Sequence, residues 1–442
     1  MTLTHCMMLL MLWLAAGSFI FALVWREFRL AGFNLNLCFS LAYLSTFYLG
    51  FPLSGWLVLY FGLPISPPNY LAYALLLPAC FYAIYYVVYK AKLPPFWRGA
   101  PLPAMKRKET HLLWVILMLI AVAALLIFIL NNGFLFFSPR SYGQRLFSKD
   151  LVLLPLKRLF YFFIPAMLVL YFLRPSFKSW VVFLAMTMSF GVLTYFAVGG
   201  TRANIALSFA LFLFIGIANH HIRLRTLLLT GGVAIGVMTW LALQRYGLKV
   251  QGAERIETLL YLTRDTFSPW ESLALLLEKY HQIDFQGLAP IIRDFYVYIP
   301  QWLWPERPNL VLNTANYFTW QVREYFAVAI SPTLIGSLLI MGGAWSFVFG
   351  AMVVGLIIKW LDGLYTAARH AQNRYTGATM QAFCFGLLFH LVVLAREGLD
   401  SFVSRLGFYC LIFGLCLLLA KLLYRLYMAM AGLRRREEIG GA

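Results

Sequence analysis

Long apolar runs alternate with short polar segments along almost the whole chain. Each run is close to the roughly 20 residues that an α-helix needs to cross a bilayer. Lipid cannot satisfy an open backbone, so a spanning segment is a helix or a strand of a closed barrel, and these runs are about twice as long as barrel strands. The pattern predicts an all-α polytopic membrane protein with about eleven transmembrane helices. We place these helices at residues 7–24, 35–60, 70–89, 112–130, 153–173, 179–198, 204–219, 226–244, 332–360, 377–394 and 406–424.

The composition agrees with this pattern. Of the 442 residues, 62% are hydrophobic and only 12% are charged, about half the charged fraction of a soluble domain. The six cysteines lie in or beside apolar runs and form no Cys-x-x-Cys pair, which argues against disulfides and zinc sites. We interpret them as small apolar residues.

Every second connecting segment is rich in Lys and Arg. Together these segments hold twenty of the 36 basic residues but only five of the 17 acidic ones. The positive-inside rule makes them cytoplasmic, so the N-terminus is predicted outside and the C-terminus inside. Topology therefore accounts for much of the net charge of +19, and no nucleic-acid partner is predicted. The basic segments begin at Arg26, Lys90, Arg174, Arg223, Lys359 and Lys421.

One outer segment, 245–331, is much longer than the others and carries mixed charges and many aromatic residues. Loops of this length inside a compact protein are usually functional, and we expect it to fold against the membrane with amphipathic helices. The predicted organisation is a bundle of eight helices (1–244), this loop (245–331), and three helices with a basic tail (332–442). No internal repeat is visible and the predicted spans contain no Asp or Glu, which disfavours an ion-coupled transporter.

Four outer arginines at or near span ends are candidates for binding phosphate: Arg202, Arg245, Arg396 and Arg405. Arg202 stands at the start of a helix after the tight turn 199–204, where free backbone N–H groups also favour anions. The alternative interpretation is an interfacial arginine that reaches lipid headgroups. Arginine is disfavoured on the outer face, which supports a functional role.

The junction 396–400 between the last two spans holds several charges. If it is helical, Arg396 and Asp400 are four residues apart and share a face. Two interpretations stay open: a salt-bridged helix end, or a half-site in which arginines bind phosphate and Glu397 or Asp400 accepts a proton.

The long loop supplies further candidates. Asp265 is a candidate base. Ser268, Pro269 and Glu271 fit the N-cap, N1 and N3 positions of a capping box, so Glu271 is discounted as a catalytic acid.

Two further arginines of the loop, Arg264 and Arg293, are candidate substrate-binding residues, although Arg293 could instead pair with its neighbour Asp294 or with lipid. Aromatic residues also crowd this loop. They fit either sugar stacking or the aromatic belt of a membrane interface. The candidates for sugar stacking are Trp270, Trp302 and Trp304.

Ligands for a divalent metal are scarce on the outer side. The first outer loop has no carboxylate, no Asp-x-Asp occurs, and the seven histidines are scattered. We therefore predict no metal and no cofactor, and charge that develops on an anionic leaving group would be stabilised by arginine.

Four stretches resemble the enterobacterial common antigen polymerases, a family of Wzy-type polysaccharide polymerases, and the resemblance extends over essentially the whole chain. They are GGTRAN at 199–204, YLTRDTFSPWE at 261–271, DFQGLAP at 284–290 and LAREGLDSFVSR at 394–405.

The resemblance implies a GT-C-like glycosyltransferase of the bacterial inner membrane whose active site faces the periplasm. Its expected substrates are trisaccharide repeat units on undecaprenyl diphosphate. The growing glycan would be transferred to the incoming unit, with release of undecaprenyl diphosphate. Membrane lipid surrounds such a protein, and a flippase and a chain-length regulator of the same pathway are expected partners.

Two alternatives remain open from the residues alone. A ligase would transfer the same glycan to a lipopolysaccharide core with nearly identical local chemistry. A non-enzymatic exporter of lipid-linked oligosaccharide is the other, although the long outer loop and the lack of carboxylates in the predicted spans disfavour it.

Overall fold

The computed structural model describes most of the chain, and all regular elements in the described part are helices. The described residues are 3–62, 64–92, 102–137, 156–199, 203–223, scattered positions between 226 and 237, 264, 268–296, 304–306, 308, 312–324 and 330–440.

Eight helical segments of the described part are long and apolar enough to cross a membrane. They agree with eight of the predicted spans, so an all-α polytopic protein is confirmed at that level, and the count of eleven stays a prediction. The eight segments are α1 (Leu3–Ala31), α2 (Leu35–Phe47) with α3 (Phe51–Phe61), α4 (Pro68–Lys90), α5 (Arg107–Asn132) with η2 (Leu135–Phe137), α9 (Phe177–Val198), α16 (Thr333–Arg369), α17 (Arg374–Gly386) with α18 (Leu388–Arg396), and α19 (Leu399–Gly440).

The other three predicted spans have a different status. Span 204–219 corresponds to α10 (Ala203–Ala218), an apolar helix that is shorter than the eight. Span 153–173 contains α7 (Lys157–Phe160) and α8 (Phe163–Leu173). Span 226–244 lies largely outside the described residues.

The described part of residues 245–331 contains short helices. They are α13 (Trp270–Glu278), η4 (Tyr280–Gln282), α14 (Ala289–Tyr296), α15 (Thr314–Tyr317) and η5 (Phe318–Val322).

The chain folds into two compact units, each assembled from three stretches of sequence. The first consists of Met1–Arg98, Thr239–Gly363 and Leu388–Leu406, and the second of Gly99–Met238, Leu364–Leu387 and Gly407–Ala442. The division at residues 244 and 331 follows the order of the chain and stays a prediction.

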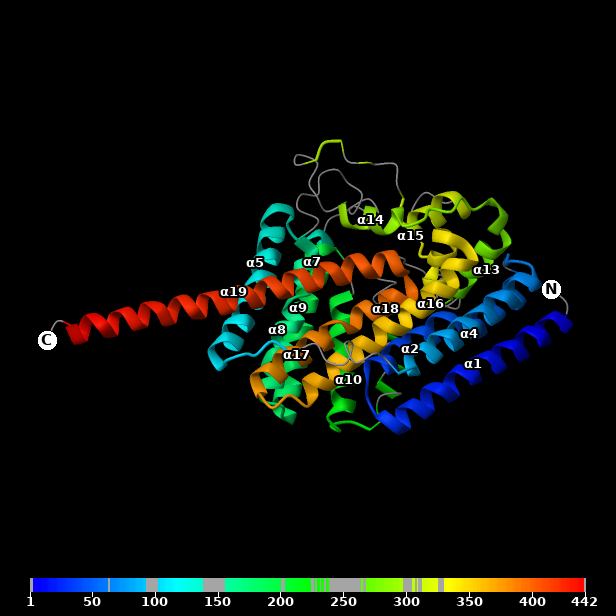
Figure 1. Cartoon of the computed structure of the whole chain (residues 1–442). Coiled ribbons are helices and arrows are strands. Elements are labelled where there is room, and N and C mark those ends of the chain that lie inside the picture. The colour runs from blue at the N-terminus through cyan, green and yellow to red at the C-terminus, as the bar shows by residue number, and fades with distance from the viewer. Residues whose placement is uncertain are drawn as a thin grey trace. The chain divides into compact units, whose positions relative to one another are not determined.

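In the first unit α1 lies against α4, α2 against α18, and α13 against α4 (Figure 1). Its core between α2 and α4 is aromatic. Tyr43 is fully buried, with its ring centroid 4.6 Å from Phe47 and 5.5 Å from Tyr82. The tyrosine hydroxyls are satisfied internally, for example Tyr85 by Asn36 at 2.6 Å, as a lipid-embedded core requires.

Helix α16 continues past residue 360 to Arg369, and the buried carboxylate of Asp362 lies in this extension, beyond the end of the predicted span 332–360. It accepts hydrogen bonds from the backbone N–H of Leu35 (2.6 Å) and from the hydroxyl of Tyr89 (2.8 Å). The carboxylate thus caps the start of α2, a structural role that explains why it is tolerated there.

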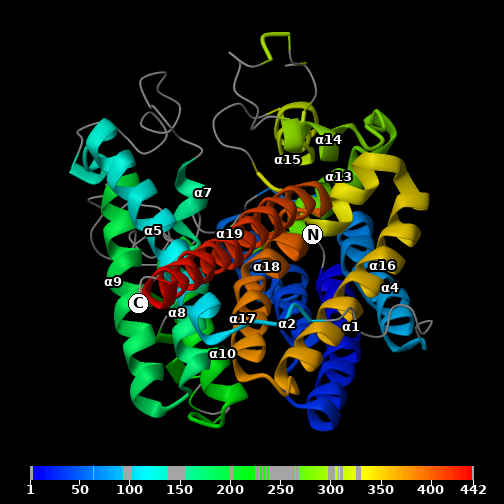
Figure 2. The same ribbon diagram turned by 60° about the vertical axis from the view of Figure 1, so that its left-hand side comes forward.

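In the second unit α8 packs against α5, α9 and α17, and α9 against α10; Figure 2 shows α5, α8, α9 and α10 together. Stacked rings bind these helices, with Phe163 4.0 Å from Phe190 and Trp180 3.9 Å from Phe212. The ring planes are nearly parallel in both pairs, at 3° and 6°.

Candidate active site

The junction between α18 and α19 is a sharp break in the first unit. Helix α18 ends at Arg396, and Gly398 has φ of +121°, a conformation that L side chains rarely adopt. A Cβ at Gly398 would lie 2.5 Å from Cβ of Ser337, so glycine is also required by space. The Ser337 hydroxyl accepts the N–H of Leu399 at 3.0 Å, where α19 starts. The segment 396–400 is not one continuous helix, so the condition under which Arg396 and Asp400 would share a helical face is not met.

Asp400 is fully buried just after this break. One carboxylate oxygen accepts the N–H of Thr314 at 2.9 Å, and the other accepts the Thr314 hydroxyl at 2.8 Å. Thr314 begins α15, so the carboxylate holds the long loop to the start of α19. Both oxygens are occupied, and Asp400 acts as a positioning residue in this conformation.

Glu397 and Arg405 meet across the same break. The two guanidinium nitrogens of Arg405 contact the two carboxylate oxygens of Glu397, with Nη1 at 3.2 Å from Oε1 and Nη2 closer to Oε2. Their side chains remain 29% and 30% exposed. A guanidinium in this bidentate geometry can also bind other planar anions, and part of its side chain is accessible to a ligand from solvent. Arg396 is partly exposed at the end of α18.

Asp294 adds a second carboxylate link to α19. It is 6% exposed and lies 3.2 Å from Nη1 of Arg293, and its other oxygen accepts the Ser404 hydroxyl at 3.4 Å. Of the two interpretations of Arg293, pairing with its neighbour is the one observed. Sequence reasoning missed Asp294, Ser404 and Thr314 as members of this site, because contacts between residues this far apart leave no local pattern.

A third arginine–carboxylate pair lies at the start of α13. Arg264 contacts Oε2 of Glu271 through Nη2 at 2.6 Å and Nε at 2.8 Å, and Nη2 also donates to the carbonyl of Pro64 at 3.2 Å. The other oxygen of Glu271 accepts the Ser54 hydroxyl at 2.5 Å. These side chains are only 15% and 16% exposed.

The predicted capping box at 268–271 is not formed. Helix α13 begins at Trp270, Pro269 precedes it without a side-chain cap, and the Ser268 hydroxyl donates to the carbonyl of Gly50 at 3.0 Å. The side chains of Ser268 and Glu271 bond to distant residues and not to the backbone of α13. Glu271 therefore has a structural role as the partner of Arg264 and not as a capping residue.

The tryptophan candidates differ in exposure. Trp270 is 1% exposed and packs on Phe51 (5.7 Å), so its faces belong to the core in this conformation. Trp304 is 39% exposed and meets Tyr296 edge-on at 5.7 Å, which leaves ring surface for a ligand. Trp302 lies outside the described residues, as do Asp265, Arg202 and Arg245.

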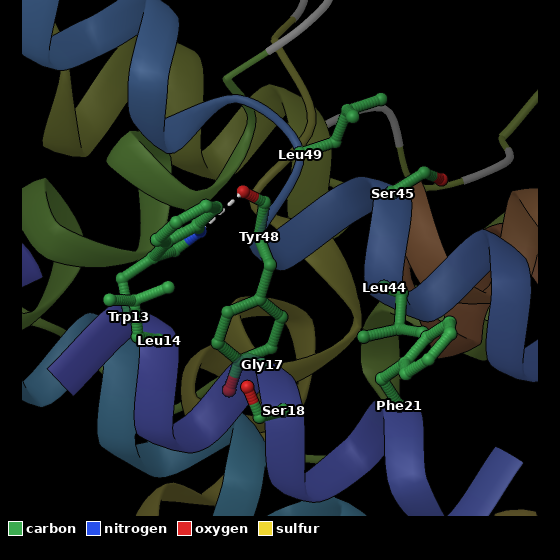
Figure 3. A pocket seen from close by; sticks show the side chains of 9 residues that line it. All are labelled: Trp13, Leu14, Gly17, Ser18, Phe21, Leu44, Ser45, Tyr48 and Leu49. Carbon is green, nitrogen blue, oxygen red and sulfur yellow. Dashed lines mark hydrogen bonds between the residues drawn. The ribbon is translucent and has the colours of Figure 1, made fainter. Parts of the chain in front are cut away.

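An apolar groove of about 370 Å³ runs between α1 and the end of α2 (Figure 3). Two of its polar side chains donate within the protein, Trp13 Nε1 to the carbonyl of Tyr48 at 2.7 Å and the Ser45 hydroxyl to that of Ala42 at 2.8 Å. The groove is therefore mostly apolar, with the exposed Ser18 as a further polar residue in its lining. It is lined by Trp13, Leu14, Gly17, Ser18, Phe21, Leu44, Ser45, Tyr48 and Leu49.

Stacked rings link this groove to α13. Trp13 stacks on Phe51 at 5.4 Å, and Phe51 contacts Trp270, the residue before Glu271. Within the described residues no three or more His, Cys, Asp or Glu side chains gather as metal ligands. Metal independence stays a prediction.

Comparison with known families gives one match over nearly the full length. The model of the WzyE protein family, described as O-antigen assembly polymerase, matches residues 1–440. No solved structure matches the chain.

Proposed function

The chain belongs to the WzyE family of O-antigen assembly polymerases, and on that premise we propose that it polymerises the trisaccharide repeat units of enterobacterial common antigen. The units are carried on undecaprenyl diphosphate, and the reaction takes place on the periplasmic face of the inner membrane. The growing glycan is transferred to the incoming unit and undecaprenyl diphosphate is released. A flippase supplies the units and a chain-length regulator acts on the product.

The reaction needs two kinds of help from the protein. The bond between the sugar C1 and the diphosphate oxygen breaks, leaving the electron pair on the diphosphate. A new bond forms between C1 and the acceptor hydroxyl oxygen, whose proton must be taken up. Fixed cations stabilise the first charge, and a carboxylate accepts the proton.

The observation that carries this proposal is the half-exposed Glu397–Arg405 pair at the α18–α19 break. A diphosphate carries more negative charge than a carboxylate and competes for the same guanidinium. Binding of the diphosphate to Arg405 therefore releases Glu397, which becomes a free base next to the reacting centre. Among the described carboxylate candidates, Glu397 is favoured over Asp400, whose oxygens are both engaged by Thr314.

The other candidates have supporting roles in this proposal. Arg396 and Arg293 extend the cationic rim around Arg405, and Arg202 and Arg245 supply further phosphate contacts. Arg264, which is held by Glu271, has a structural role in this proposal. Asp265 is the second candidate base. Exposed aromatic rings, with Trp304 as the described example, stack on sugars. The groove lined by Trp13 accommodates part of a polyprenyl chain, since its lining is mostly apolar.

The test uses a strain that lacks the polymerase, together with purified protein in detergent. Glu397→Gln should abolish the ladder of repeats while lipid-linked substrate still binds, whereas Glu306→Gln, a carboxylate in the long loop outside this cluster, should be silent. A normal ladder from Glu397→Gln at normal protein level would remove Glu397 from the chemistry.

Product analysis separates the alternatives. A single transfer of glycan to a lipopolysaccharide core would establish a ligase, and a lack of turnover without a membrane to cross would favour an exporter. Turnover that is lost with a chelator and restored by Mg²⁺ or Mn²⁺ would contradict metal independence.

A further inference from the structure

A cluster of basic residues belongs to the second unit, whereas the arginine–carboxylate pairs described above belong to the first. It is formed by the start of α5 and by the last turns of the candidate membrane-spanning part of α19, which ends at Met430. The ammonium group of Lys106 lies 5.4 Å from the ring centroid of Tyr424, and that of Lys108 lies 4.7 Å from Tyr427. Two exposed lysines of one helix start are thus held by two tyrosines of another helix.

The positive charge of this cluster is not neutralised by the acids of the described part. Neither Lys106 nor Lys108 has a carboxylate within ion-pair distance among the described residues. Glu109 is the nearest acid in sequence, but it is buried, and its Oε2 accepts the backbone N–H of Lys106 at 2.8 Å. Because Glu109 caps the N-terminus of α5, an anion would be bound by the side chains of Lys106 and Lys108 and not by the backbone N–H groups of the helix.

Helix α19 brings more positive charge to the same level. Lys421 precedes Tyr424 by one turn, and Arg425 follows it directly, with an exposed side chain. The charge pattern of the sequence predicts that this end of both helices is cytoplasmic. Tyrosine and basic residues at the end of a span are typical of the headgroup region of a membrane.

A continuous apolar stripe runs along α19 from this cluster toward the middle of the span. It consists of Leu411, Leu415, Leu418 and Leu422, which are 60%, 52%, 62% and 54% exposed. Their spacing of three or four residues places them on one helical face, next to that of Lys421 and Arg425. A ligand that fits both parts has an anionic head and long hydrocarbon chains.

We propose that Lys106 and Lys108, oriented by Tyr424 and Tyr427, bind the phosphodiester headgroup of an anionic membrane phospholipid whose acyl chains lie along the leucine stripe of α19. A zwitterionic lipid carries its own cation, which these lysines repel, so the site selects for net negative charge. This site is separate from the proposed transfer site and does not depend on the polymerase activity.

The experiment is a lipid titration of the purified, delipidated full-length protein followed by native mass spectrometry. The probes are dioleoyl phosphatidylglycerol and dioleoyl phosphatidylcholine. Wild-type protein should bind the first at least about tenfold more tightly. In Lys106→Gln/Lys108→Gln the affinity for phosphatidylglycerol should fall about thirtyfold while that for phosphatidylcholine is unchanged.

A matched control removes two other exposed basic residues of the same unit. Arg174→Gln/Lys178→Gln loses the same charge near the start of α9 and should bind both lipids as wild type does. Tyr427→Ala keeps both lysines and removes one orienting ring, so it should lose about two- to fivefold. It also serves as the test if the double lysine variant fails to fold.

Three results would overturn the proposal. The first is equal affinity of wild-type protein for the two lipids, and the second is an equal loss in the control variant. The third is displacement of the lipid by glycerol 3-phosphate at the concentration of the lipid itself, which would assign the cluster to a soluble phosphate instead.

Discussion

Two arginine–carboxylate pairs in the first unit have the same chemistry in different surroundings. The Arg264–Glu271 pair is about 15% exposed and has two further partners, the Ser54 hydroxyl and the Pro64 carbonyl. The Glu397–Arg405 pair is about 30% exposed and spans a break between helices. A largely buried pair that makes further hydrogen bonds to neighbouring residues stabilises the fold. A more exposed pair without such additional partners can exchange the carboxylate for an anionic ligand. Exposure and partner number, more than residue type, therefore distinguish a structural pair from a reactive one.

The largest expected effect comes from Arg405→Ala. Loss of a fixed charge that stabilises a leaving group costs about 10²- to 10³-fold in turnover. We expect polymerisation to fall by that factor in vitro. The thermal midpoint should fall only a little, because the pair is about 30% exposed and water screens the attraction between its charges. Arg405→Lys should recover only part of the activity, since a lysine cannot make the bidentate contact.

Arg264→Ala is the corresponding change in the more buried Arg264–Glu271 pair. It should lower the thermal midpoint and the amount of protein in the membrane, because it leaves a largely buried carboxylate without its cation. If Arg264→Ala instead left a stable protein whose turnover was as low as that of Arg405→Ala, the distinction between the two pairs would be lost.

The next largest effect is expected from a substitution of Gly398, at the break between α18 and α19. Gly398→Ala forces a side chain into φ of +121° and against Ser337, so we expect a loss of about 3 kcal/mol or more, seen as a lower thermal midpoint and reduced polymer. Gly414→Ala is the control in the same helix, where a Cβ meets nothing within 4 Å. It should be neutral or stabilise by about 0.5–1 kcal/mol. Equal behaviour of the two variants would mean that the break is not needed.

The hydrophobic pattern of the sequence predicts the long helices but not the breaks within them. The apolar runs predict helices such as α1, α4 and α9 well, because length and hydrophobicity alone determine a spanning helix. The interruption between α2 and α3, and that between α17 and α18, are not visible in the pattern, since both flanks are apolar.

The site is less predictable than the fold. Glu397 and Arg405 could be named from their charges, but they are eight residues apart and pair only because Gly398 breaks the helix. The contact of Asp400 with Thr314 joins residues 86 apart and leaves no local signature. The capping motif at 268–271 was misleading, because Arg264 and Ser54 offered Glu271 stronger partners than its own helix.

A smaller effect is expected from Asp400→Asn. The amide oxygen can still accept the N–H of Thr314, and the amide N–H₂ group can donate to the Thr314 hydroxyl oxygen. Both hydrogen bonds lose the charge of the carboxylate, so about 1–2 kcal/mol of stability is lost. The thermal midpoint should fall, and the activity per folded molecule should fall less. Glu397→Gln should behave in the opposite way, with a normal midpoint and low turnover. A normal midpoint for Asp400→Asn together with low turnover would return Asp400 to the chemistry.

The smallest effect is expected from Ser54→Ala. It removes one hydrogen bond to Glu271 and leaves the Arg264 contact in place, so the expected loss is about 1 kcal/mol, measured as a shift of the thermal midpoint in detergent. Turnover per folded molecule should equal that of wild type, because this pair is structural. Thr46→Val in α2 is the control, since the Thr46 hydroxyl donates to the carbonyl of Ala42 in its own helix and Thr46 does not line the groove. A fall in turnover with Ser54→Ala but not with Thr46→Val would show that the Arg264–Glu271 pair also takes part in the reaction, and that its low exposure reflects one state of the cycle.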